Sequence, residues 1–131
     1  MMSLKHGLSI ALRSLFALSS ALALVVLITL GGGELADATG FPRGGEARLA
    51  WDLGWVFLAG MFAAWMVVKL APRAPRMHAV VFFALMSGVA LLAVIRLGDD
   101  WPCWFSAGIL LAVPLQVGLG AGWVLREKKY A

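Results

Sequence analysis

Charged residues are scarce in this 131-residue sequence. Asp, Glu, Lys and Arg together make up 14% of the chain, whereas hydrophobic residues make up 62%. A soluble domain normally carries roughly a quarter of its residues as charged side chains. With so few charges, a soluble fold of this size could not cover its own apolar surface. We therefore expect the chain to lie in a membrane.

Catalytic and ligand-binding patterns are missing as well. No Cys-x-x-Cys, His-Glu-x-x-His, Gly-x-Ser-x-Gly or phosphate-loop pattern occurs in the chain. Cys103 is the only cysteine, so it cannot form a disulfide within the chain. His6 lies too far before the first apolar run to face His78 across a haem, and we expect both imidazoles to be solvated at the interface. We predict no enzyme, no cofactor and no metal site.

Apolar residues occur in long runs without charge. The four uncharged windows contain 20, 16, 17 and 25 residues and are Ser14–Gly33, Leu53–Val68, Ala79–Ile95 and Trp101–Leu125. A helix needs about 20 apolar residues to cross a bilayer, within a range of roughly 17–25. The second window is long enough if Asp52 and Lys69 sit at the two interfaces. The runs show no alternation of apolar and polar residues, which excludes a transmembrane β-barrel.

These windows predict an all-α membrane protein with a single domain. We expect four transmembrane helices, at about residues 9–31, 50–71, 78–97 and 102–125, packed as an up-down bundle because two of the connections are short. Residues 31–50 contain six glycines and a proline, so we expect a long loop there. A cleaved signal peptide ending near Ala36-Asp37-Ala38 is the alternative for the first run, but that run is long for a signal peptide.

The basic residues are distributed unevenly along the predicted topology. Eight of the eleven fall on the side that holds both chain ends: Lys5, Arg13, Lys69, Arg73, Arg76, Arg126, Lys128 and Lys129. Lys and Arg accumulate in the cytoplasmic segments beside short membrane loops. We therefore expect both termini in the cytoplasm of a bacterial-type inner membrane. The basic residues are divided among three short segments, which does not favour a nucleic-acid partner.

Small residues indicate where helices could approach one another closely. The fourth helix carries Gly118 and Gly122 at Gly-x-x-x-Gly spacing, the third offers Gly88, and the second offers Gly60. Close backbone contact through small residues carries much of helix association in lipid. We predict that these four glycines pack helices within one bundle, and a seam between two copies is the alternative.

Polar groups at the expected mid-depth are few, and none is ionisable. The most prominent is Gln116, whose amide needs partners in hydrocarbon. We predict that a serine across the bundle, such as Ser20 or Ser87, supplies one. The alternative is a polar path or ligand contact beside Pro114, which we expect to kink the fourth helix.

A second candidate site lies at the predicted outer face. It contains four charged residues, Asp52, Arg96, Asp99 and Asp100. Asp52 and Arg96 close consecutive helices at similar depth, so we expect them to form an ion pair. A structural clamp is the main interpretation of this cluster, and binding of a cation or a partner is the alternative.

The sequence contains no catalytic motif and no charge in the middle of a predicted span that would indicate a particular reaction. We therefore expect a small inner-membrane scaffold whose partners are the lipid bilayer and either other membrane subunits or copies of itself. The alternative is a small oligomeric transporter or channel whose polar path passes Gln116.

Overall fold

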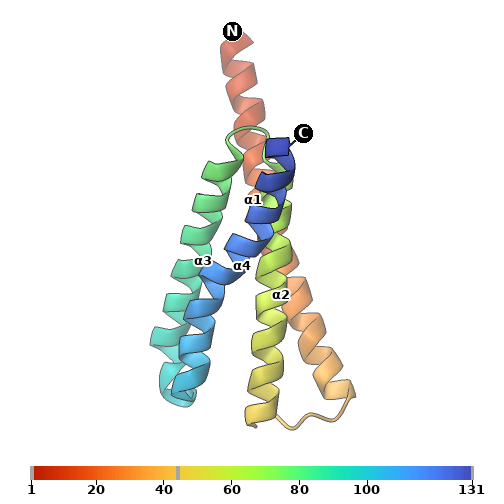
Figure 1. The fold of residues 1–131 in the computed structure, drawn as a ribbon, viewed down its shortest axis with the longest axis vertical. Helices are drawn as coiled ribbons and strands as arrows, with labels where there is room; N and C mark the ends of the chain where they lie inside the picture. Colours follow the sequence, from red (N-terminus) through yellow and green to blue (C-terminus); the bar gives the residue numbers. More distant parts are fainter. Residues whose placement is uncertain (1, 44, 131) are drawn as a thin grey trace.

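The computed structural model describes residues 2–43 and 45–130 of the chain (Figure 1). Within those ranges the chain is helical and contains no strand. The elements are α1 (Met2–Ala38), α2 (Glu46–Leu70), α3 (Pro75–Leu97), the 3-10 turn η1 (Gly98–Asp100) and α4 (Cys103–Tyr130). All four long helices are long and apolar enough to span a membrane. The predicted all-α class and the predicted number of long apolar helices are confirmed for the described residues.

The helices run up and down, so the first residue of α1 and the last residue of α4 lie at the same end of the molecule (Figure 1). We call this end the terminal end and the opposite end the distal end. The α2–α3 connection also lies at the terminal end. It turns at Ala74, which has a left-handed backbone (φ 48°), and Pro75 then begins α3 with a preset φ.

Helix α1 is much longer than the sequence suggests. Its 37 residues extend over roughly 55 Å at 1.5 Å per residue, and its first turns project beyond the bundle (Figure 1). It also continues through the three glycines at 31–33, so the long loop expected over 31–50 is wrong. The reason is packing, because the Trp55 side chain of α2 occupies the space that a Cβ at Gly32 would need. Gly32 therefore serves close helix contact, and the turn falls at Gly40 (φ 83°).

The order of contacts across the bundle is α1, α2, α4, α3. Helices α2 and α4 form the central pair, α1 packs along α2, and α3 packs mainly on α4. Helix α1 makes only a small contact with α3. The main neighbour of α2 is therefore α4, although α3 follows α2 in the sequence.

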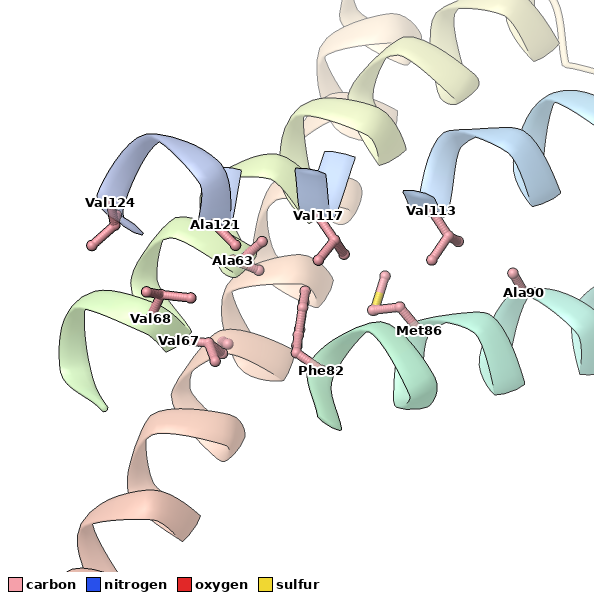
Figure 2. Close-up of a cluster of buried hydrophobic side chains, with 12 residues drawn as sticks. Ala63, Val67, Val68, Phe82, Met86, Ala90, Val113, Val117, Ala121 and Val124 are labelled. Atoms are coloured by element: carbon pink, nitrogen blue, oxygen red, sulfur yellow. The ribbon is translucent and has the colours of Figure 1, made fainter. Parts of the chain in front are cut away.

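Small aliphatic residues dominate the core. Figure 2 shows side chains from α2, α3 and α4 gathering in one cluster. The members that it labels are Ala63, Val67, Val68, Phe82, Met86, Ala90, Val113, Val117, Ala121 and Val124. Alanine and valine allow neighbouring backbones to lie close together. Phe82 and Met86 of α3 fill the space between α3 and α4 (Figure 2). The short side chains explain how the helices pack without long interdigitating residues.

Large apolar side chains also cover the outside of the molecule. Leu15 and Phe16 on α1, Ile95 on α3, and Leu111 and Trp123 on α4 are all more than 60% exposed. A soluble monomer rarely exposes contiguous apolar surface on this scale. The exposure matches helices that are apolar on every side, as expected for spans surrounded by lipid.

Candidate functional site

The side chain of Gln116 is the most unusual group in the molecule. It is 1% exposed and lies in the seam between α2 and α4. Its amide rests on the backbone of Gly60, where a Cβ would overlap the amide atoms. Both amide atoms, Oε1 and Nε2, lack a hydrogen-bond partner among the described residues. An amide buried without hydrogen bonds costs roughly 1–3 kcal/mol in proteins.

The serines that we expected to satisfy this amide do not reach it. Ser87 on α3 and Ser20 on α1 are half-buried, and neither is hydrogen-bonded to Gln116. The contact order of the bundle explains the difference, because Gln116 points at α2 while the serines lie on the flanking helices. Pro114 is exposed on another side of α4, which stays helical before and after it. In the described structure, Gln116, Ser20, Ser87 and Pro114 therefore do not form one connected polar path.

Two glycines permit the close approach of α2 and α4. Gly60 accommodates the amide of Gln116, and Gly120 lies against the backbone carbonyl of Met61 with Ala64 beside it. A Cβ at Gly120 would overlap that carbonyl oxygen. Gly60 was predicted as a packing residue. Gly120 was not, because the prediction followed the Gly-x-x-x-Gly spacing of Gly118 and Gly122, which lie on a different side of α4.

The other three predicted packing glycines have no such neighbour. A Cβ at Gly88, Gly118 or Gly122 would meet nothing within 4 Å in the described part of the chain. Gly118 and Gly122 line an open groove between α3 and α4, and Gly88 lies on the exposed side of α3. The prediction that these three glycines pack helices within one chain is therefore wrong.

Arg48 organises the charges at the distal end. It donates a hydrogen bond from Nη1 to the Asp37 carboxylate (2.7 Å), another from Nε to Asp52 (3.2 Å), and a third from Nη2 to the Gly33 carbonyl (3.3 Å). Its side chain is 11% exposed. Arg43 is 82% exposed and binds the same Asp37 carboxylate at 2.7 Å. The hydrogen bond with Asp37 raises the pKa of the Arg43 guanidinium above its usual value. These contacts fasten α1 to the start of α2.

The predicted ion pair between Asp52 and Arg96 is absent from the described side chains. Asp52 is held by Arg48, which precedes it by one turn on the same helix. Arg96 is exposed near the distal end of α3, and this end lies apart from the distal end of α2 in Figure 1. Asp99 and Asp100 are exposed in η1, close to Arg96 along the chain. The predicted cluster is therefore divided between the two sides of the bundle.

Two further side chains connect helices. The Trp51 indole donates from Nε1 to the Gly32 carbonyl at 2.9 Å, which adds to the α1–α2 contact at the distal end. At the terminal end, Nε2 of His78 lies 2.9 Å from the Ser14 hydroxyl, and its Nδ1 lies 3.1 Å from the Ala74 carbonyl. His78 therefore joins α3 to α1, and the expectation that it is merely solvated is wrong.

The described residues contain no group of three side chains able to hold a metal ion. No protein-family model, curated protein or solved structure matches the chain significantly. The functional interpretation therefore depends on the geometry of the chain itself.

Proposed function

We propose that this protein is a small scaffold of a bacterial-type inner membrane, with both termini in the cytoplasm, which packs against other membrane subunits or copies of itself. The observation that carries the proposal is the glycine pair on the α3–α4 face. Gly118 and Gly122 are four residues apart on α4, and a Cβ at either position would meet nothing within 4 Å in the described part of the chain. Residues at this spacing share one side of a helix.

The physics of helix association in lipid supports this use of the face. Lipid chains solvate apolar side chains as well as another helix does, so helices associate mainly where small residues allow close packing. The close contacts inside the chain already use other glycines, namely Gly32, Gly60, Gly108 and Gly120. The pair that remains open is thus available to a helix from outside the chain. The basic residues beside the helices favour the cytoplasmic placement of the termini.

The test is the mass of the intact assembly after purification in mild detergent. We expect the natural protein to be retained with further polypeptides or copies of itself. Gly118→Leu and Gly122→Leu should release the protein as a folded monomer, because a leucine at either position would hold the partner helix away. Gly54→Leu is the matched control, since Gly54 is equally open but lies on α2. A monomeric natural protein, or unchanged assembly in both glycine variants, would reject the proposal.

A transporter or channel is the second candidate, and the buried amide of Gln116 favours it. Polar groups inside membrane spans are costly and are commonly associated with function. If the α2–α4 seam opens during transport, Gln116 gains partners in water or on a substrate. Its unpaired amide in this structure is then a property of the closed state.

This second candidate predicts that water reaches position 116. In a Cys103→Ser background, the Gln116→Cys variant in membranes should react with a membrane-impermeant thiol reagent. A cysteine at Val113, one turn away and 3% exposed, serves as the control for leakage into the apolar core. If position 116 stays unreactive while a thiol placed in the distal loop at Thr39 is modified, there is no water path past Gln116.

A further inference from the structure

An apolar groove opens on the α2–α4 seam toward the terminal end. Its volume is about 260 Å³, and it is lined by Met61, Phe62, Trp65, Leu119, Gly120 and Trp123. Gly120 belongs to this lining and contributes no side chain to fill the space, and its backbone lies against the Met61 carbonyl. The volume is slightly below the roughly 300–1,000 Å³ of pockets for small organic ligands. Its small volume and its apolar lining suit part of a single hydrocarbon chain.

Opposite charges flank the mouth of this groove. On α2, the Lys69 ammonium lies 4.7 Å from the centre of the Trp65 ring, one turn beyond the lining. On α4, the Glu127 carboxylate accepts a hydrogen bond of 2.9 Å from the Trp123 indole through Oε1. Lys69 and Glu127 form no ion pair with each other in the described part of the chain. Each charge is fixed beside the groove by an aromatic wall residue and remains open to a ligand.

We propose that this groove is a binding site for a phospholipid with a primary-amine zwitterionic headgroup, such as phosphatidylethanolamine. One acyl chain lies between the aromatic walls, the headgroup phosphate contacts Lys69, and the headgroup ammonium donates to Glu127. This inference depends on the proposed insertion into a bilayer and does not depend on the scaffold role.

The charges of Lys69 and Glu127 at the mouth of the groove distinguish this headgroup from other phospholipid headgroups. An anionic phospholipid such as phosphatidylglycerol could satisfy Lys69 with its phosphate and donate a glycerol hydroxyl to Glu127, but it has no cation to neutralise the Glu127 carboxylate. A quaternary ammonium, as in phosphatidylcholine, has no N–H to donate to Glu127. It is usually bound over aromatic faces, and Lys69 already lies over the face of Trp65. A primary ammonium provides both the charge and the N–H donors.

Native mass spectrometry of the full-length protein in mild detergent tests the site. The protein is titrated with phosphatidylethanolamine, phosphatidylcholine and phosphatidylglycerol that carry identical acyl chains. We expect the first lipid to be retained most strongly by the natural protein. Lys69→Gln and Glu127→Gln should each reduce this preference by up to about fivefold, the scale of one exposed charge contact. Arg73→Gln removes a charge from the α2–α3 connection away from the groove and should leave the preference unchanged.

A second pair of variants tests the acyl-chain part of the site. Leu119→Trp fills the groove and should abolish preferential retention, whereas Leu115→Trp, one turn away and outside this groove, should preserve it. Equal retention of the three lipids, stronger retention of phosphatidylglycerol, or an unchanged preference in both charge variants would overturn the proposal. The same spectra give the mass of the assembly. A monomer that keeps the lipid preference rejects the scaffold alone, and an intact assembly without the preference rejects the lipid site alone.

Discussion

The buried amide of Gln116 destabilises the fold, because no hydrogen bond in the described structure compensates for its desolvation. The side chain is among the largest fully buried ones, together with Phe82 and three valines, yet it is the only polar member of that group. In the described structure neither of its amide atoms is hydrogen-bonded. Replacing such a group with an apolar one of similar shape can stabilise a protein, because the desolvation penalty disappears.

We therefore expect Gln116→Met to raise the stability of the protein in detergent by roughly 1–3 kcal/mol, the usual penalty of an unsatisfied buried polar group. Methionine retains the unbranched shape that fits over Gly60. The free energy of unfolding, measured by denaturant titration, provides the check. Leu115→Met, at a 59% exposed neighbouring position, should change little. A destabilised Gln116→Met protein would mean that the amide has a partner in the membrane.

Gly120 and Gly118 form a matched pair of substitutions on the same helix. Gly120→Ala should destabilise the protein by roughly 1–3 kcal/mol, the usual effect of overpacking, because the new Cβ meets the Met61 carbonyl. Gly118→Ala meets open space and should be neutral or stabilising by up to about 1 kcal/mol through helix propensity. Thermal melting in detergent distinguishes the two. Equal effects of the two substitutions would show that α2 and α4 are not in close contact at Gly120.

At the scale of single elements, the distal ends of α1 and α2 are joined by polar contacts. Arg48 reaches the Asp37 carboxylate and the Gly33 carbonyl of α1 while it also holds Asp52 on its own helix. The Trp51 indole adds a bond to the carbonyl of Gly32. These contacts hold the last turns of α1 in place beyond the glycines that the sequence suggested as a loop.

Arg48→Gln should therefore loosen the C-terminal turns of α1, and Arg43→Gln should not. Both arginines contact Asp37, but the Arg48 side chain is 11% exposed and the Arg43 side chain is 82% exposed. Hydrogen exchange at the amides of Thr39, Gly40 and Phe41, which bond back to the last turns of α1, measures the effect. We expect clearly faster exchange in the Arg48 variant only. Similar exchange in the two variants would argue against Arg48 as the residue that holds the last turns of α1 in place.

The differences between prediction and structure have a common physical origin. Hydropathy locates a candidate span because a bilayer requires one long apolar run, and all four long helices of the described chain follow from it. The same uniformity hides which side of each helix packs inward, since the sides facing lipid and protein are both apolar. The sequence therefore predicted close packing at Gly118 and Gly122, whereas the structure places it at Gly120. The burial of Gln116 was expected, but its lack of partners depends on the contact order of the helices, which no local pattern encodes. Arg48 and Asp52 could have been found from their i, i+4 spacing.

At the scale of the whole molecule, the four helices place the start of α1 and the end of α4 at the same end. The terminal end carries the α2–α3 connection, which contains Arg73, and the first turn of α3, which contains Arg76. The distal end carries η1 (Figure 1) and the contacts of Arg48 that join α1 to α2. Positive charge is retained on the cytoplasmic side of a membrane during insertion, while acidic residues have little effect on orientation. The side chains of Lys128 and Lys129, which were counted in the charge pattern, lie outside the described ones.

The uneven distribution of Lys and Arg between the two ends predicts the orientation of the molecule in the membrane. A reporter that is active only in the cytoplasm should function when fused after Ala131, which itself lies outside the described residues, and should fail when inserted after Thr39 in the distal loop. A reporter active only outside should give the reverse pattern. Changing Arg73 and Arg76 to Gln together removes two charges from the α2–α3 connection and the first turn of α3 and should mix the orientations, whereas the same change at Arg43 and Arg96 should strengthen the original one. If both fusions report the same side, the chain does not cross the membrane four times, and the scaffold proposal fails with it.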